Sequence, residues 1–496
     1  MNFRTQFSSA PKAHEARQWK VSLLTSATTL IVTLSQMAGP AFGAVLRVPA
    51  DHATIQRAVD AAKPGDTVLV SPGKYSETVT TKVSGTPTQP ITIDGANKAA
   101  LNQVVLRHSH IRLQNLEISG APQSYQRLLY FDLGAHFCVV SNNVIDLANA
   151  RSVYGIEWRM SRIKPFGVGD AASDNLVISN TVKNCSAFIM MSVMGDRNVI
   201  QGNRLIDSPN ADMFRLFGRS NVIRGNFCLN SPHIPNLGNH PDFIQTFGNN
   251  GDGSRGHIIE DNVAIKLEGA QITQLEGNLM PEISDWTFRN NLFVDVALQA
   301  SCTIPRVKYY NNTFIRCNYK NGGHALTFSV RTYQSFSTYT GATGNNYAHE
   351  AQVFNNVFVD CGITNYNRGW YGFSSELNGI AANYNYVGKN GYLPVREDKL
   401  RRAIGSSGGW DTFGWFEPNG VNGGDPRFVN PSVANYRLLS NSPIADTGTP
   451  LAIVPRDFDG VPRPQGSGWS MGAFEPLSSI IATRPQPVSN LRVVLQ

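Results

Sequence analysis

Residues 239 to 248 read NHPDFIQTFG and place a histidine and an aspartate beside a run of strand-forming residues. Pro241 lies between the two and restricts the backbone of His240 to an extended conformation. A histidine and a carboxylate fixed at the edge of a polar groove are suited to proton transfer, because imidazole titrates near neutral pH. We therefore predict that His240 and Asp242 form a proton-transfer pair at the rim of a groove. A histidine with a purely structural role is the alternative.

The strand DFIQTFG (242–248) aligns with DMFRLFG (212–218) before it and with QITQLEG (271–277) after it. Side chains alternate between the two faces of a strand. Alternation predicts two outward columns, one of Ser192, Arg215, Gln245 and Gln274 and the other of Met194, Phe217, Phe247 and Glu276. Arginine and amides bind carboxylates and hydroxyls, and aromatic rings stack on sugars. This face is predicted to bind a sugar polymer, with an ordinary solvated sheet face as the alternative.

Further basic residues come from GIEWRMSRIKPFG (155–167), which we interpret as an insertion that overhangs the groove. It contains Arg159, Arg162 and Lys164, and the segment 324–333 adds His324 and Arg331. The residues assigned to catalysis are His240, Asp242 and Arg215. The residues assigned to substrate binding are Gln245, Gln274, Phe217, Phe247, Asp212, Glu276 and Arg159.

These strands belong to a repeat in which an asparagine sits between two short apolar runs. The aligned asparagines are Asn142, Asn180, Asn203, Asn226, Asn262, Asn291, Asn312 and Asn356. Their shortest spacings are 21 to 23 residues, with longer ones where loops are inserted, as a solenoid requires. No helical periodicity separates the runs. The pattern predicts an all-β, right-handed parallel β-helix in which the asparagines stack and satisfy buried backbone groups.

Both ends of the repeat carry recognisable segments. Residues 48–79 begin with an amphipathic helix whose apolar face holds Ile55, Ala58, Val59 and Ala62. The far end contains NYRLLSNSPIADTG, DFDGVPRP and WSMGAFE, between residues 435 and 475. These segments resemble the ends of exported bacterial β-helix proteins of the pectate-lyase-like superfamily, over about residues 46 to 476. The resemblance implies the fold and an N-terminal capping helix. It does not decide the reaction, because the superfamily contains lyases, hydrolases, epimerases and adhesins.

The start of the chain is predicted to be a signal peptide. A basic stretch precedes the apolar run VSLLTSATTLIVTL, and Ala41 and Gly43 suit cleavage before Ala44. A short membrane anchor is the alternative. The predicted organisation is a signal peptide (1–43), an N-terminal cap and first coils (44–90), a β-helix core (91–365), C-terminal coils and loops (366–476) and a tail (477–496). We expect the protein to be secreted or periplasmic, with no integral membrane segment after cleavage.

The net charge, the cysteines and the acidic motifs of the chain limit its possible binding partners and cofactors. The chain has 496 residues and a net charge of +7, of which the predicted signal carries +3, leaving +4 without a basic run. Nucleic acid is therefore not indicated, and we expect a monomer. Six cysteines without metal-binding spacing are interpreted as buried thiols, with a Cys317–Cys361 bridge as the alternative. No cofactor is predicted with certainty. Ca²⁺ stays open, since Asp457 and Asp459 could bind it, although a turn is the favoured interpretation.

Together these features favour an exported lyase that cleaves an acidic, uronate-containing polysaccharide by β-elimination. Arg215 would neutralise the uronate carboxylate, His240 would act as base or acid, and Asp242 would orient His240. A β-helix glycoside hydrolase is the first alternative, with two carboxylates drawn from Asp212, Asp242 and Glu276. A uronate epimerase and a non-catalytic glycan-binding surface or matrix protein are the others.

Overall fold

The computed structural model describes residues 43–476 with internal gaps, and it is almost entirely β-structure. The gaps are 121–125, 160–170, 238–240, 248–252, 278–282, 321–324, 329, 334–343, 362–370, 375–380, 389–400, 405–408, 413–416 and 423. The predicted signal peptide therefore lies outside the described residues, apart from Gly43. Among the residues described, no helix is long and apolar enough to cross a bilayer.

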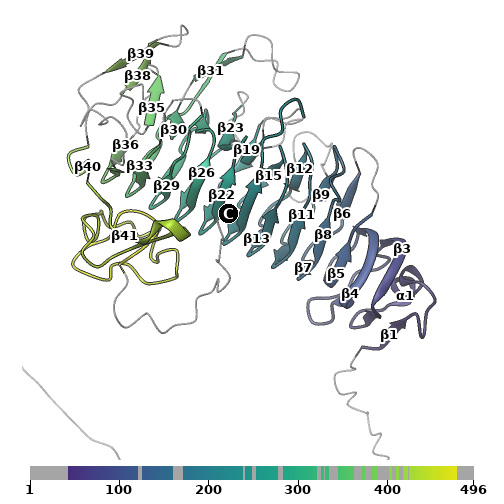
Figure 1. The fold of residues 1–496 in the computed structure, drawn as a ribbon. Coiled ribbons are helices and arrows are strands. Elements are labelled where there is room, and N and C mark those ends of the chain that lie inside the picture. The colour runs from purple at the N-terminus through teal and green to yellow at the C-terminus, as the bar shows by residue number, and fades with distance from the viewer. Residues whose placement is uncertain are drawn as a thin grey trace, which may run out of the picture. The chain divides into compact units, whose positions relative to one another are not determined.

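The strands stack in three lines of parallel pairings, which we name sheets I, II and III (Figure 1). Sheet I contains β7 (Val139–Ser141), β10 (Leu176–Ile178), β13 (Val199–Gln201), β17 (Val222–Arg224), β21 (Ile258–Glu260), β25 (Thr287–Arg289), β28 (Lys308–Tyr310), β33 (Gln352–Phe354) and β36 (Ala381–Asn383). Sheet II contains β8 (Val144–Asp146), β11 (Thr181–Lys183), β14 (Arg204–Ile206), β18 (Phe227–Ser231), β22 (Val263–Leu267), β26 (Leu292–Val296), β29 (Thr313–Ile315), β34 (Val357–Val359), β37 (Tyr386–Gly388) and β40 (Val421–Asn422). Sheet III contains β6 (Arg127–Phe131), β9 (Tyr154–Trp158), β12 (Ile189–Val193), β15 (Asp212–Leu216), β19 (Asp242–Thr246), β23 (Gln271–Leu275), β27 (Ala300–Cys302), β30 (Leu326–Phe328), β35 (Tyr371–Ser374) and β38 (Arg401–Ile404).

Each coil contributes one strand to each sheet, so the predicted fold class, a right-handed parallel β-helix, is confirmed. The first coils are built from β1 (Val45–Val48), β2 (Thr67–Val70), β3 (Gly73–Thr80), β4 (Ile91–Leu106) and β5 (Ile111–Ile118). A short three-stranded sheet joins β16 (Gly218–Arg219), β20 (Ser254–Arg255) and β24 (Ile283–Ser284). Three antiparallel pairs are also present: β31 (Val330–Tyr333) with β32 (Gly344–Tyr347), β38 with β39 (Gly409–Thr412), and β41 (Phe428–Asn430) with β42 (Asn435–Leu438).

Helix α1 (Ile55–Ala61) lies beside these first coils, as predicted. The Thr54 hydroxyl caps it by accepting a hydrogen bond from the N–H of Arg57 at 3.2 Å. Ile55, Ala58 and Val59 are buried, and so is Ala62 directly after the helix. The apolar face identified in the sequence is therefore the face that packs on the core.

An asparagine ladder runs between sheets I and II. At each step the side-chain oxygen of one asparagine accepts from both the backbone N–H and the side-chain amide of the asparagine one coil earlier, as Asn226 does from Asn203 at 2.9 and 3.0 Å. The ladder contains Asn143, Asn180, Asn203, Asn226, Asn262, Asn291, Asn312, Asn356 and Asn385. Glu417 ends it by accepting the amide hydrogens of Asn385.

The prediction for the first member of this ladder was wrong by one residue. β7 begins at Val139, so Asn143 and not Asn142 occupies the ladder position. Asn142 has a left-handed φ of 56° and donates a hydrogen bond to Asn115 outside the ladder. Asparagine tolerates a left-handed conformation better than most other non-glycine residues. This explains why an asparagine also stands at position 142, directly before the ladder residue Asn143.

A second ladder, not identified in the sequence, lies five residues before the first in four successive coils. Asn175 donates to Asn198, Asn198 donates to Asn221, and the N–H of Asn221 donates to Nδ1 of His257 at 3.1 Å. His257 is fully buried, and burial lowers its pKa to about 3, so its ring is neutral at physiological pH. The spacings repeat those of the first ladder and were the signal that could have revealed it.

The C-terminal segment, residues 425–476, packs on the outer face of the later coils of sheet II. Val263, Leu292 and Val357 point outward from sheet II and form a second apolar core with residues of this segment. The segment contributes Tyr436, Leu438, Ile444, Met471, Ala473 and Phe474. A solenoid face that would otherwise expose aliphatic side chains is thus covered by the chain itself.

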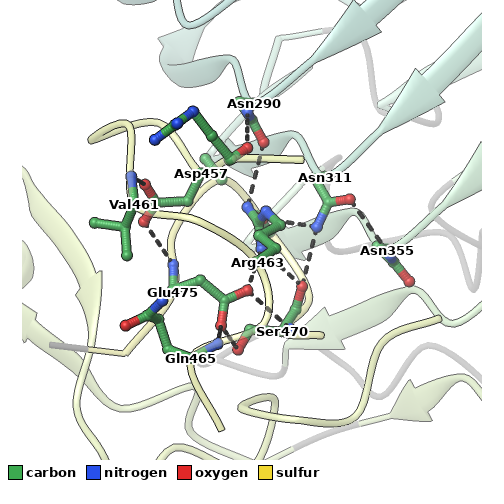
Figure 2. A network of polar contacts seen from close by, with 12 residues as sticks. Asn290, Asn311, Asn355, Asp457, Val461, Arg463, Gln465, Ser470 and Glu475 are labelled. Atoms are coloured by element: carbon green, nitrogen blue, oxygen red, sulfur yellow. Dashed lines mark hydrogen bonds and ion pairs between the residues drawn. The ribbon is translucent and has the colours of Figure 1, made fainter. Parts of the chain in front are cut away.

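Polar contacts beside this second core fix the segment to the coils (Figure 2). Nη1 of Arg463 lies 2.6 Å from Oε1 of Glu475, and both side chains are fully buried. Arg463 also donates to the side-chain oxygen of Asn290 at 3.2 Å. Asn311 and Asn355 donate from neighbouring coils to the carbonyls of Ser470 and Thr449. The network connects residues that are far apart in the sequence.

The motif DFDG forms a turn within this segment. Asp457 accepts the N–H groups of Val461 at 2.8 Å and Glu475 at 2.9 Å. Asp459 binds Arg437 through both carboxylate oxygens at 2.6 Å. These contacts support the turn interpretation over calcium binding for the motif.

All six cysteines are free thiols in the structure. Five are buried and Cys361 is half-buried. Burial raises the pKa of Cys138 and Cys302 to about 12. The thiols pack as the sequence interpretation predicts, and Cys317 and Cys361, the pair of the alternative, interact with each other.

Candidate functional site

The strand register of sheet III places Ser192, Arg215, Gln245 and Gln274 opposite one another, as predicted. The same line continues to Glu157 and Tyr130 in earlier coils and to Ser301 and Thr327 in later coils. We call these eight residues the outer column. Met191, Phe214, Ile244 and Thr273 precede these residues in sequence and are fully buried. Within the outer column Arg215 and Gln274 are half-buried, whereas Ser192 and Gln245 are buried.

Arg215 is held in place by a carboxylate from its own strand. Its Nε lies 2.7 Å from Oδ2 of Asp212, a fully buried residue. The other oxygen of Asp212 accepts the backbone N–H of Asp242 at 3.1 Å. The guanidinium of Arg215 also lies over the ring of Phe247, 5.7 Å from its centroid. Arg215 is thus the cation of the outer column and is oriented from two sides.

Asp242 lies at the first position of β19, where the register pairs it with Gln271. The residue is fully buried, and its carboxylate oxygens are shielded from solvent. The following Phe243 is also buried and packs edge-to-face against Phe214 and Phe293. Two consecutive inward residues, Phe243 and Ile244, interrupt simple alternation at the start of the strand. Asp212 and Asp242 therefore begin their strands, as expected, but neither carboxylate is displayed on an open surface.

The prediction that Phe217 stacks on sugar from the outer face is wrong. Phe217 is 1% exposed and belongs to the interior core. β15 ends at Leu216, and Gly218 follows with a left-handed φ of 79°, so alternation stops before Phe217 and its ring turns inward. Phe247, which is half-buried, packs edge-to-face on Phe217 at 5.3 Å. Of the two predicted aromatics, Phe247 alone keeps an accessible edge.

Gln274 and Glu276 form a chain of hydrogen bonds with Gln271. The side-chain amide of Gln271 donates to Oε1 of Gln274 at 3.0 Å, and the amide of Gln274 donates to Oε1 of Glu276 at 2.5 Å. Both polar groups of Gln274 are therefore engaged within the protein. The contact between Gln274 and Glu276 joins the two predicted columns and orients the amide.

The structure adds an earlier part of the face that the sequence interpretation missed. Residues 155–158 were read as an insertion but belong to β9, a regular strand of sheet III. Nε of Arg127 lies 2.6 Å from Oε2 of Glu157, and its guanidinium lies 4.3 Å from the ring centroid of Tyr130. Burial raises the pKa of Glu157, against the opposing effect of Arg127. The inward pair Ile156 and Trp158 was the signal that could have revealed this strand.

Arg159 directly follows β9 and is exposed. Its Nη1 lies 2.8 Å from Oδ1 of Asp132, and this hydrogen bond raises the pKa of Arg159. It therefore lies directly after β9, beside the residue that follows β6. His240, Arg162, Lys164 and His324 lie outside the described residues, as does the side chain of Arg331. The described part of the chain contains no group of three or more His, Cys, Asp or Glu residues arranged to hold a metal.

Comparisons with known proteins give a likeness of fold. No protein-family model matches the chain, and no curated protein matches it. The PL6 family polysaccharide lyase Pedsa3628 from Pseudopedobacter saltans superposes with a TM-score of 0.51 at 12% sequence identity, over 77% of this chain and 92% of that one. The shared fold is the parallel β-helix. The PL6 family alginate lyase AlyGC gives a TM-score of 0.44 at 12% identity, over 89% of this chain and 59% of that one.

Proposed function

We propose that the chain is an exported polysaccharide lyase that cleaves a uronate-containing polymer by β-elimination. The observation that carries this proposal is the outer column of sheet III, in which Arg215, held by buried Asp212, lies between polar neighbours. From Ser192 to Thr327 this column carries one cation, hydroxyls and amides, which suits an acidic polymer that binds across stacked strands. The likeness to the PL6 family lyase from Pseudopedobacter saltans is consistent with this assignment.

The reaction requires three roles. A base removes the proton at C5 of the uronate, the electron pair forms the C4=C5 double bond, and the C4–O bond breaks with protonation of the leaving oxygen. Charge that develops on the carboxylate must be stabilised meanwhile. Arg215 would supply that stabilisation, His240 would act as the base or the acid, and Asp242 would orient His240.

Elimination is favoured over hydrolysis by the positions of Asp212 and Asp242, two of the three candidate carboxylates, which would leave Glu276 without a second carboxyl group. A glycoside hydrolase needs two carboxyl groups facing the scissile bond. Asp212 is fully buried and bound to Arg215, and the oxygens of Asp242 are shielded from solvent. Neither is placed to protonate a sugar oxygen directly.

A panel of acidic polysaccharides incubated with the mature protein tests the proposal. We expect an ultraviolet-absorbing unsaturated uronate at the new chain ends. New reducing ends without that absorbance would refute elimination in favour of hydrolysis. Inversion at C5 without cleavage would indicate an epimerase, and binding with no chemical change would indicate a glycan-binding protein.

A further inference from the structure

We propose that Asp212, Arg215 and Gln245 form one subsite that recognises a uronate residue with a free carboxylate and a free ring hydroxyl. The proposal rests on the proposed function and makes its substrate class more specific. It assigns Asp212 as a positioning residue and Gln245 as a residue that determines specificity.

The first part of the argument concerns the orientation of Arg215. A guanidinium offers five N–H donors in a rigid fork. Asp212 takes the Nε donor at 2.7 Å. Within the described residues, no hydrogen bond or ion pair of the two terminal nitrogens is found. With Nε fixed, these nitrogens remain as a pair able to bind a carboxylate in bidentate fashion.

Asp212 is suited to positioning because it is itself immobile. It is fully buried, and its second oxygen accepts the N–H of Asp242 from the next coil. Water does not compete for a carboxylate in this position, so the Arg215 contact persists in the free protein. Phe247 limits movement of the guanidinium on another side at 5.7 Å.

The second part concerns Gln245, which lies opposite Arg215 in the next coil. Gln245 is 5% exposed, and its side-chain oxygen is buried without a hydrogen-bond partner in the part of the chain that the structure describes. A buried acceptor without a donor is unfavourable, and such groups indicate a ligand or another partner. The neighbouring Gln274 does not provide the donor, because its amide is engaged with Glu276.

Arg215 and Gln245 together match the dimensions of a single sugar. Adjacent parallel strands lie about 5 Å apart, which is comparable to the distance between the carboxylate and the hydroxyls across a pyranuronate ring. Arg215 would bind the carboxylate, and a hydroxyl of the same ring would donate to Oε1 of Gln245. A methyl ester would remove the charge that Arg215 requires. An O-acetyl group would remove the donor that Gln245 requires.

The test measures binding of three uronate trisaccharides to the mature protein by calorimetry: the unmodified form, its methyl ester and its O-acetyl derivative. We expect the wild type to bind the unmodified form about tenfold or more tightly than either derivative, as the loss of a charged or buried hydrogen bond predicts. Arg215→Lys and Asp212→Asn should lose the discrimination against the ester and keep that against the acetyl group. Gln245→Leu should show the opposite pattern.

A matched control and a folding check accompany the variants. Asp174→Asn breaks an exposed pair with Arg197 outside sheet III and should bind like the wild type. Circular dichroism identifies variants that fail to fold. If Asp212→Asn does not fold, Arg215→Lys alone tests recognition of the carboxylate. Equal affinity of the wild type for all three trisaccharides, or variants that keep both kinds of discrimination, would overturn the subsite.

The outcomes separate this inference from the proposed reaction. The crossed pattern of discrimination without any unsaturated product would support the subsite and refute the lyase reaction. Unsaturated product formed equally from modified and unmodified polymers would support the lyase and refute the subsite.

Discussion

Arg215 contributes to recognition mainly through its fixed direction. An exposed ion pair contributes about 1 kcal/mol or less to stability, because both side chains lose freedom and water screens the charges. The Asp212–Arg215 pair differs because the Asp212 side chain is fully buried while the Arg215 side chain is 23% exposed. The cost of ordering the arginine is met during folding and does not recur on binding.

At the same scale, we predict that His240→Ala lowers turnover by about 100-fold or more, the usual contribution of a general base or acid. Thermal unfolding should be unchanged, because the residue is assigned to proton transfer and not to packing. Initial rates on the preferred polysaccharide, with melting followed by circular dichroism, provide the measurement. His52→Ala, in the N-terminal segment before α1, is the control. Wild-type rates for His240→Ala would remove the residue from the mechanism.

The element that determines the positions of these residues is the coil, and the asparagine doublets show how a coil is closed. In Asn142–Asn143 the first residue adopts a left-handed φ and points outward, while the second enters the ladder. The same arrangement recurs at Asn290–Asn291 and Asn311–Asn312, where the outward residue binds the C-terminal segment. Two identical neighbours thus have unrelated functions.

This difference gives a prediction within one doublet. Asn143→Ala removes the acceptor for the backbone N–H of Leu116 and the donor to the carbonyl of Leu113, both in the buried interior. We expect a loss of about 2 to 4 kcal/mol in the free energy of unfolding. Asn142→Gly keeps the left-handed conformation and should cost less than about 1 kcal/mol. Urea unfolding of both variants checks the difference, and equal losses would contradict the ladder assignment.

The end of the ladder predicts a dependence on pH. Burial raises the pKa of Glu417 to about 7 from a usual 4.5, and hydrogen bonds from Asn385 oppose the rise. The native state therefore holds this proton more tightly than the unfolded chain. The stability contribution is complete below about pH 4.5 and is lost as the pH rises through about 7.

Glu417→Gln should remove this dependence, because the glutamine side chain does not titrate and its single oxygen can still accept the backbone and side-chain N–H groups of Asn385. We expect the variant to be about 2 to 3 kcal/mol more stable than the wild type at pH 8 and similar at pH 4. Urea unfolding across this pH range measures the effect. Glu350→Gln, at an exposed carboxylate, is the control. Parallel stability curves for Glu417→Gln and the wild type would disprove the assignment.

Regular features of the coil were predictable from the sequence, and local departures from regularity were not. Alignment of the repeats was enough to place Arg215 opposite Gln245 and Gln274, because every coil pairs in the same register. Phe217 was misplaced because alternation ends with the strand, and no pattern in the sequence marks that point. The burial of Asp212 was missed because the two residues after it, Met213 and Phe214, are both buried, which a strictly alternating strand does not predict. Residues 155–158 were missed because loops of variable length obscure the spacing.

At the scale of the whole molecule, the C-terminal segment makes contacts that no repeat could predict. Arg463 binds Asn290, 173 residues earlier, and Asn311 binds Ser470, 159 residues later (Figure 2). The segment is not periodic, so its partner surface could not be read from spacing. The outward aliphatic residues of the later sheet II strands, such as Val294 and Val359, are the sequence feature that indicates a covered face.

The buried Arg463–Glu475 pair yields a prediction about stability. Removing one partner leaves the other charge buried and unpaired, so Arg463→Met and Glu475→Gln should each lower the free energy of unfolding by about 3 to 5 kcal/mol. The double variant should cost less than the sum of the two. A double-mutant cycle by urea unfolding measures the coupling. Arg197→Met, in an exposed pair with Asp174, should cost about 1 kcal/mol or less. Losses no larger than that control would contradict the proposed role of the network.

The return of the C-terminal segment also affects the order in which the molecule can form during synthesis. The coils from β7 to β15 are joined by strand pairings between neighbouring coils. Each of these coils can therefore fold once the next coil has left the ribosome. The coils from β22 to β37 keep an uncovered aliphatic face until Met471 and Phe474 are available. Contacts between residues so distant in sequence close slowly. The later half of the solenoid therefore keeps an exposed apolar face, which chaperones can bind, until residues 471–474 have left the ribosome.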